Sequence, residues 1–201
     1  MRGTVAGSGS IRIVGGRWRG RKLMAPEDRA IRPTGERQRE SLFNILGHGA
    51  YAPGGVSMLQ GAAVLDVFAG TGALGLEALS RGAANALFLE QAANARRLIE
   101  ANIAAFKAQG AARLVLGDAT NPVAPPPAPW TPATLVFLDP PYGKELGPKA
   151  LAALNAKGWL APGCVAVAET GEHEDFAVPE GFAQEDMRDY GKTTLRFLRK
   201  L

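Results

Sequence analysis

A chain of 201 residues, 46% of them hydrophobic, is long enough to bury one α/β core. No apolar run approaches membrane-spanning length and the first ten residues lack the apolar core of a secretory signal, so we expect a cytoplasmic protein without contact to a membrane. The single cysteine, Cys164, lies in an apolar run and allows neither an internal disulfide nor a cysteine metal cluster, and we expect no bound metal.

Basic charge is concentrated near the N-terminus. Residues 1–50 hold ten Arg or Lys and four acids, whereas the net charge of the whole chain is only +4. We predict a flexible tail over residues 1–10, followed by a basic extension over residues 11–50. Arginine pairs with phosphates and stacks on bases, as tryptophan does, so the extension is predicted to hold RNA. A merely solvated basic segment is the alternative. The predicted RNA contacts are Arg17, Trp18, Arg19, Arg21 and Lys22.

An amphipathic helix is predicted over residues 36–46, and a glycine-rich turn follows the next apolar strand. Gly70 and Gly72 let the backbone bend sharply and approach a ligand closely. Together with Gly75 they match the pattern G-x-G-x-x-G, so a nicotinamide dinucleotide is a rival ligand for this turn. Residues 73–81 are predicted to be the helix that follows it.

Acids follow the next two predicted strands. The strand 86–89 ends at Glu90, at the spacing expected of an acid that binds ribose hydroxyls. The strand 113–116 leads to Asp118, where an acid could bind the amine of an adenine ring. Each acid could instead be a solvated strand end. Their positions at successive strand ends, with Asp66 before them, favour a ligand site.

A proline-rich segment precedes the most informative motif. Residues 121–132 contain six prolines and are predicted to form a stiff surface loop. The buried strand 135–138 then ends in the tetrapeptide Asp139-Pro140-Pro141-Tyr142. This tetrapeptide suits the exocyclic amine of a nucleobase, because the Asp139 carboxylate and the Pro140 carbonyl can accept its N–H groups while Tyr142 stacks on the base. A simple strand-ending turn is the alternative.

The element order predicts an α/β fold with a mostly parallel sheet, helices on both faces and a short N-terminal extension. Residues 182–189 and 193–198 flank a short turn and predict a C-terminal antiparallel hairpin. Ligands bind such sheets at the carboxyl ends of the strands, where the strand order reverses. We therefore expect the strand ending in Asp66 and the strand ending in Asp139 to be neighbours.

These motifs together resemble a known family. The glycine turn, the two later acids and the tetrapeptide are similar to Rossmann-type methyltransferases that use S-adenosylmethionine. The tetrapeptide resembles that of the amino-methyltransferases, which modify adenine N6, cytosine N4 or guanine N2. Residues 12–23, 32–44 and 75–83 resemble the bacterial RsmD family of 16S ribosomal RNA guanine-N2 methyltransferases. The resemblance extends from residue 11 to the end of the chain.

The resemblance implies S-adenosyl-L-methionine as cofactor, S-adenosyl-L-homocysteine as product, and a methyltransferase domain over residues 51–201. It implies 16S rRNA within an assembling small ribosomal subunit as substrate, and we expect a monomer. The implied catalytic residues are Asp139, Pro140, Pro141 and Tyr142. The implied cofactor-binding residues are Asp66, Phe68, Gly70, Gly72, Glu90, Asp118 and Ala119. Arg32 and Thr34 belong to a segment that resembles the family's loop beside the active site, and they are predicted to contact RNA.

Other interpretations stay open at this point. One is another amino-methyltransferase of the same class, acting on DNA adenine or on a protein glutamine. Others are an NAD-dependent oxidoreductase and a non-catalytic RNA-binding protein that uses the glycine turn. The tetrapeptide argues against the oxidoreductase, which has no need of it. A separate DNA target-recognition domain is not expected, because the chain has little length beyond the catalytic domain.

Overall fold

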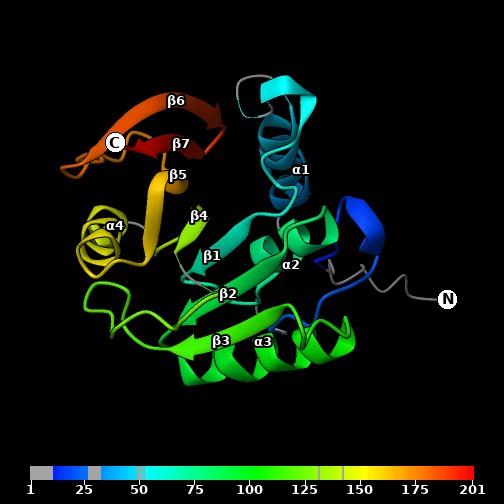
Figure 1. Ribbon diagram of the computed structural model, residues 1–201. Coiled ribbons are helices and arrows are strands. Elements are labelled where there is room, and N and C mark those ends of the chain that lie inside the picture. The colour runs from blue at the N-terminus through cyan, green and yellow to red at the C-terminus, as the bar shows by residue number, and fades with distance from the viewer. Residues whose placement is uncertain (1–10, 27–32, 49–50, 52, 131, 142) are drawn as a thin grey trace, which may run out of the picture.

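A seven-stranded sheet with the strand order β3-β2-β1-β4-β5-β7-β6 forms the centre of the computed structural model (Figure 1). The structure describes residues 11–201 except 27–32, 49–50, 52, 131 and 142. The first five strands in this order run parallel, whereas β7 pairs antiparallel with both of its neighbours, β5 and β6. This arrangement confirms the predicted fold class. The strands are β1 (Ala63–Val67), β2 (Asn85–Glu90), β3 (Ala112–Leu116), β4 (Ala133–Leu138), β5 (Leu160–Gly171), β6 (Phe182–Tyr190) and β7 (Thr193–Lys200).

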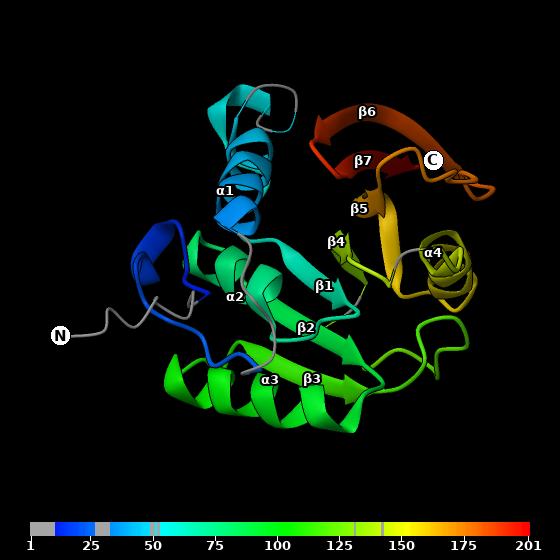
Figure 2. The same ribbon diagram turned by 180° about the vertical axis from the view of Figure 1, so that it is seen from behind.

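Helices cover both faces of the sheet (Figure 2). Side chains alternate between the two faces along each strand, so Val64 and Phe137 belong to one apolar core while Leu65 and Val136 belong to the other. The first core is closed by α1, α2 and α3, and the second by α4. No helix in the described part of the chain is long and apolar enough to cross a membrane. The helices are α1 (Pro33–Gly47), α2 (Ala73–Ser80), α3 (Ala93–Ala105) and α4 (Leu146–Ala156), with 3₁₀ turns at Gly16–Trp18 and Pro53–Gly55.

Most element boundaries lie within a few residues of those expected, and two of the differences concern α1 and β1. The helix predicted over residues 36–46 begins at Pro33, where the missing N–H of a proline costs nothing because the first N–H groups of a helix have no intrahelical partner. Strand β1 continues past Asp66 to Val67, so Asp66 lies inside the strand and not at its end. The side chain of Asp66 consequently points into the protein and is 2% exposed.

The proline-rich segment between β3 and β4 takes the place of a crossover helix, since the described residues there form no helix. The loop is fastened from both sides: the Trp159 indole N–H donates to the Val123 carbonyl at 3.0 Å, and the Asn85 amide donates to the Pro129 carbonyl at 2.8 Å. Trp130 packs against the second apolar core. The predicted loop is confirmed, and it closes part of the face that α4 leaves open.

Residues 11–24 form an arm that folds back on itself and packs against α2 and α3. A bridge joins Arg12 to Lys22, and Ile13 and Leu23 are buried in the first core. The arm approaches α2 so closely that a Cβ on Gly16 would lie 2.0 Å from the carbonyl oxygen of Ser80, and the φ of Gly16 is +73°. Only glycine fits this position.

One buried carboxylate, that of Glu77 on α2, fastens the arm. Glu77 is fully buried and accepts hydrogen bonds from the backbone N–H groups of Val14 and Gly15, both at 2.8 Å. The guanidinium of Arg81 lies 2.7 Å from the same carboxylate, and that of Arg39 on α1 lies 4.0 Å away. A buried charge requires such partners, so Glu77 links the arm, α1 and α2.

Replacing Glu77 with Ala should lower the free energy of unfolding by about 3–5 kcal/mol, because it leaves two mostly buried cations and two N–H groups without their acceptor. Urea denaturation measures the loss. The matched control is Glu100→Ala on α3, whose ion pair with Arg96 has both side chains 50% exposed. An exposed pair contributes about 0–1 kcal/mol. Equal losses in the two variants would contradict the anchoring role of Glu77.

Candidate active site

The glycine turn and the tetrapeptide begin side by side at the carboxyl edge of the sheet. Strands β1 and β4 pair in parallel, with Val67 opposite Leu138. The next residue, Asp139, donates its backbone N–H to the Val67 carbonyl at 3.5 Å. The expectation that these two strands are neighbours is therefore confirmed. The strand order reverses between them, because β2 and β3 extend the sheet beyond β1 while β5 extends it beyond β4.

The turn after β1 uses a backbone conformation that few residues adopt. Phe68, Gly70 and Gly72 all have positive φ values, of 60°, 56° and 77°. A Cβ on Gly72 would also lie 3.1 Å from the ring of Phe88, so the turn has little room for a side chain at that position. The non-glycine Phe68 is held by a backbone hydrogen bond to the Leu89 carbonyl at 3.0 Å. The turn is thus a compact backbone cradle.

Asp66 holds this turn against the helix that follows it. Its Oδ2 accepts the backbone N–H of Gly75, in the first turn of α2, at 2.8 Å. Burial raises the pKa of Asp66 to about 8, the carboxylates of Asp139 and Glu90 add to the rise, and the Gly75 hydrogen bond opposes it. Asp139 and Glu90, which the sequence also singled out, therefore both lie within electrostatic reach of Asp66.

Glu90, at the end of β2, closes the cradle from the side. Its Oε2 accepts the N–H of Gly70 at 2.9 Å, and its Oε1 accepts those of Gln91 and Ala92 at 2.9 and 2.8 Å. The residue is only 8% exposed. A carboxylate has about four lone-pair positions, so Oε2 keeps the capacity to accept a further hydrogen bond from a ligand hydroxyl.

The loop after β3 is more open. The side chain of Asp118 is exposed, and its Oδ1 accepts both the backbone N–H and the hydroxyl of Thr120 at 2.8 Å, a local turn that asparagine and aspartate often form. Ala119 is 3% exposed and belongs to the second core. The predicted contacts of Asp118 and Ala119 with a cofactor stay predictions.

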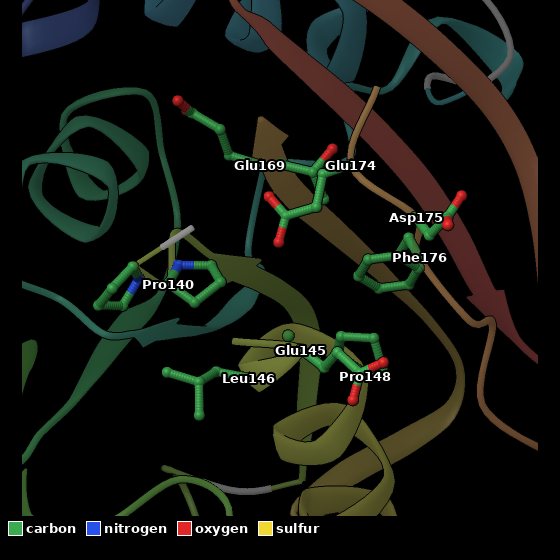
Figure 3. Close-up of a pocket in the computed structure, with 11 residues that line it drawn as sticks. Pro140, Glu145, Leu146, Pro148, Glu169, Glu174, Asp175 and Phe176 are labelled. Carbon is green, nitrogen blue, oxygen red and sulfur yellow. The ribbon is translucent and has the colours of Figure 1, made fainter. Parts of the chain in front are cut away.

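Pro140 and Pro141 of the tetrapeptide line a small pocket at the end of β4 (Figure 3). Asp139 and Pro141 are exposed and Pro140 is buried, whereas Tyr142 lies outside the described residues. The pocket is small and partly open to solvent, and it continues between the start of α4 and the end of β5. The sequence singled out none of the four acids that line it, which are Glu145, Glu169, Glu174 and Asp175. Glu174 contacts Gly143, 31 residues earlier in the chain, so no local motif indicated that contact.

The arm, which carries the predicted RNA-binding residues between 17 and 22, lies at the other end of α2. The arm contacts Ser80 at the end of this helix, about 12 Å along its axis from the glycine turn (Figure 1). Trp18 packs edge-on against Phe106 at 5.1 Å, and the Arg17 guanidinium lies 4.2 Å from the Trp18 ring. The guanidinium of Arg21 donates to the Ala105 carbonyl at 2.6 Å.

These contacts give Trp18 and Arg21 a packing role, and their contacts with RNA stay predictions. Arg19 and Lys22 are exposed. Arg32 and the side chain of Thr34 lie outside the described residues. Among the residues that the structure describes, no group of three or more His, Cys, Asp or Glu side chains is arranged to hold a metal ion.

The raised pKa of Asp66 predicts a pH-dependent stability. Because its pKa rises from 3.8 in the unfolded chain to about 8, the folded protein binds the proton more tightly between these values. Its contribution to the free energy of unfolding should therefore fall as pH increases from about 4 to 8, by at most about 1.4 kcal/mol per pH unit. Asp66→Asn keeps an acceptor for Gly75 and removes the titration, so the variant should gain stability relative to the natural protein across this range. Parallel stability curves for the two proteins would contradict the prediction.

Comparison with known proteins identifies the family. The family model described as Conserved hypothetical protein 95 matches residues 11–199. The chain is 45% identical over 156 residues to ribosomal RNA small subunit methyltransferase D of Escherichia coli, which covers 78% of this chain and 72% of the relative. It is 33% identical over 174 residues to the protein of the same name from Haemophilus influenzae, which covers 87% of this chain and 86% of the relative.

Solved structures share the fold. An Escherichia coli protein of known structure is 37% identical, with a TM-score of 0.77 and coverage of 96% of this chain and 98% of its own. An RNA methyltransferase from Salinibacter ruber, solved in complex with S-adenosyl-L-homocysteine, is 15% identical with a TM-score of 0.58 over 84% of this chain and 94% of its own, a likeness that concerns the fold alone. By the family model and the Escherichia coli relative, this chain belongs to the RsmD family of ribosomal RNA small subunit methyltransferases.

Proposed function

We propose that this protein transfers a methyl group from S-adenosylmethionine to the exocyclic N2 amine of a guanine in 16S ribosomal RNA. The observation that carries the proposal is the juxtaposition of the glycine turn after β1 with the tetrapeptide after β4. A cradle that can hold a cofactor and an acid that can hold an amine then meet at one edge of the sheet. Membership of the RsmD family supports the same activity.

The residues around the glycine turn fit the proposed cofactor. S-adenosylmethionine has no phosphate, so its site needs a close backbone surface for the methionine part and acceptors for the ribose hydroxyls. The turn with its positive φ at Gly70 and Gly72 suits the first, and the Glu90 carboxylate suits the second. Asp118, exposed at the next strand end, is in our proposal the acceptor for the adenine amine. When bound, the cofactor supplies an already activated methyl group on its sulfonium sulfur.

Asp139 and Pro140 orient the nucleophile in the proposed mechanism. The amine of guanine is a weak nucleophile because its lone pair is delocalised into the ring. Hydrogen bonds from its two N–H groups to the Asp139 carboxylate and the Pro140 carbonyl hold the nitrogen in place and oppose the positive charge that develops during attack. Asp139 need not remove a proton beforehand, since the neutral amine attacks and the surplus proton leaves later.

A second carboxylate beside Asp139 favours guanine over the other amine-bearing bases. Leu138 pairs with Ala168, so Asp139, just after β4, and Glu169, within β5, are the next residues along the two adjacent strands. Glu169 is half-buried at the pocket. Guanine presents an N1–H donor next to its amine, which a carboxylate accepts. Adenine and cytosine present an acceptor at that place, which a carboxylate repels.

The basic arm is proposed to hold the RNA at a distance from the reacting base. The guanidinium of Arg17 stacks on Trp18, and Arg19 and Lys22 are exposed, so cations follow one another along the surface of the arm. Such a surface suits the phosphates of a folded RNA more than a single base. As part of the proposal, the protein acts as a cytoplasmic monomer on an assembling small ribosomal subunit.

Replacing Asp139 with Ala should slow methyl transfer by about two to three powers of ten, because it removes one preorganised group that opposes the developing charge. Asp139→Asn should be similarly slow, since the charge itself is lost. Single-turnover transfer to the RNA substrate, followed by mass spectrometry of its nucleosides, gives both the rate and the modified base. Calorimetry should give an unchanged affinity for S-adenosylmethionine in both variants.

Two results would overturn the proposal. Near-normal transfer by Asp139→Ala would reduce the tetrapeptide to a turn. Binding of NAD by the natural protein, with no response to S-adenosylmethionine, would assign the glycine turn to the rival cofactor.

The arm is tested with Arg17→Ala/Arg19→Ala, a double variant that leaves the internally bonded Arg21 in place. We expect weaker RNA binding and a shallower salt dependence, by about 0.7 in the logarithmic slope for each lost contact with single-stranded phosphate. Lys157→Ala/Arg188→Ala removes the same charge from exposed positions outside the arm and serves as the control. Equal RNA affinities of the two double variants across several salt concentrations would leave the arm a merely solvated segment.

A further inference from the structure

One carboxylate outside the tetrapeptide fastens the segment that follows it. Glu174 lies in the loop between β5 and β6 and is half-buried. Its Oε1 accepts the backbone N–H of Gly143 at 2.8 Å, and its Oε2 accepts that of Gly171 at 2.9 Å. Gly143 follows the tetrapeptide directly in the chain, and Gly171 ends β5. Both oxygens of this one side chain therefore join the ends of two loops that lie far apart in the sequence.

The loop that carries Glu174 is itself held by the sheet. Arg196, on β7, donates to the backbone carbonyl of Glu174 at 2.9 Å and to the Thr170 hydroxyl at 3.4 Å. Its guanidinium also lies 5.8 Å from the ring of Phe176. Three contacts from one strand residue thus position the loop relative to the end of β5. These contacts hold Glu174 at the position from which its side chain accepts the Gly143 N–H.

The location of this carboxylate connects it to the candidate active site. Figure 3 shows Glu174 at the pocket that Pro140 and Pro141 also line, with Phe176 beyond it. Gly143 has a φ of +74°, and no atom would lie within 4 Å of a Cβ at that position. Close packing therefore does not fix Gly143. The hydrogen bond to Glu174 joins Gly143 to a part of the chain 31 residues away.

We infer that Glu174 is a positioning residue for methyl transfer: it holds Gly143, and the loop anchored there keeps Asp139 and Pro140 in the right geometry to meet the amine. This inference rests on the proposed function. Groups that orient a substrate must be held within about 0.5 Å of their productive positions. A displacement of about 1 Å can cost roughly 100-fold in rate, even when its cause lies away from the reacting atoms.

Glu174→Ala and Glu174→Gln form a graded pair for the test. Alanine removes both acceptors, whereas glutamine keeps one oxygen and turns an amide N–H₂ toward the other donor. We expect a single-turnover rate about 10- to 100-fold lower for Glu174→Ala and an intermediate rate for Glu174→Gln. Affinities for S-adenosylmethionine and RNA, measured separately, should stay within about twofold, because Glu174 belongs neither to the glycine turn nor to the basic arm.

Glu172→Ala is the matched control. Glu172 lies in the same loop. Its side chain is 54% exposed and lies 3.5 Å from the exposed imidazole of His173. Hydrogen–deuterium exchange of the peptide that contains Gly143 provides a readout apart from activity. The exchange should become faster in both Glu174 variants and remain unchanged in Glu172→Ala.

The outcomes separate this inference from the proposed function. If the natural protein forms no N2-methylguanine in ribosomal RNA, the proposed function fails whatever the variants do. If the natural protein is active and both Glu174 variants match it in rate, the inference alone is overturned. It is also overturned if cofactor affinity falls in proportion to the rate, which would indicate a general structural role. Should Glu174→Ala fail to fold, Glu174→Gln decides by the same measurements.

Discussion

The parallel pairing of β1 with β4 is the constraint on which the rest of the site depends. Neither the glycine turn nor the tetrapeptide can bring a cofactor and an amine together by itself. The two strands end at the same edge of the sheet, with Val67 opposite Leu138, so the loops that follow them both begin at that edge. Because the chain continues from β1 toward β2 and from β4 toward β5, those loops turn away from each other and leave space between them.

Several carboxylates lie near that edge, and the protein limits the electrostatic repulsion between them in two ways. Asp66 is buried beneath the turn and holds its proton up to a pKa of about 8, so it does not add a full charge at neutral pH. Glu90 and Glu174 instead have their charges distributed over backbone N–H groups, three for Glu90 and two for Glu174. Each of these three carboxylates consequently stabilises a loop close to the proposed site of methyl transfer.

The basic arm shows how a charged surface can be attached firmly to such a domain. Glu77 is completely buried, yet it contacts two N–H groups of the arm and a guanidinium from α2. The arm joins the same apolar core as α1 and α2 through Ile13 and Leu23. A surface fixed in this way presents its cations in one arrangement, which suits recognition of RNA by shape.

Local patterns in the sequence were enough to predict the helices, strands and loops, because hydrophobic periodicity, glycines and prolines act on the backbone near them. It predicted the mostly parallel sheet, the helix that begins near residue 36, the proline-rich loop and the C-terminal hairpin, and it identified the family motifs. The side chains that contact and hold those motifs could be identified only from the folded structure. Glu174 contacts Gly143, 31 residues earlier, and Glu77 contacts Val14 across 63 residues, and no spacing in the chain signals either pair. The packing role of Trp18 was hidden for the same reason, since its neighbour Phe106 comes from another element. Local patterns report how a segment folds, whereas contacts between distant segments exist only after the strands have been ordered in the sheet.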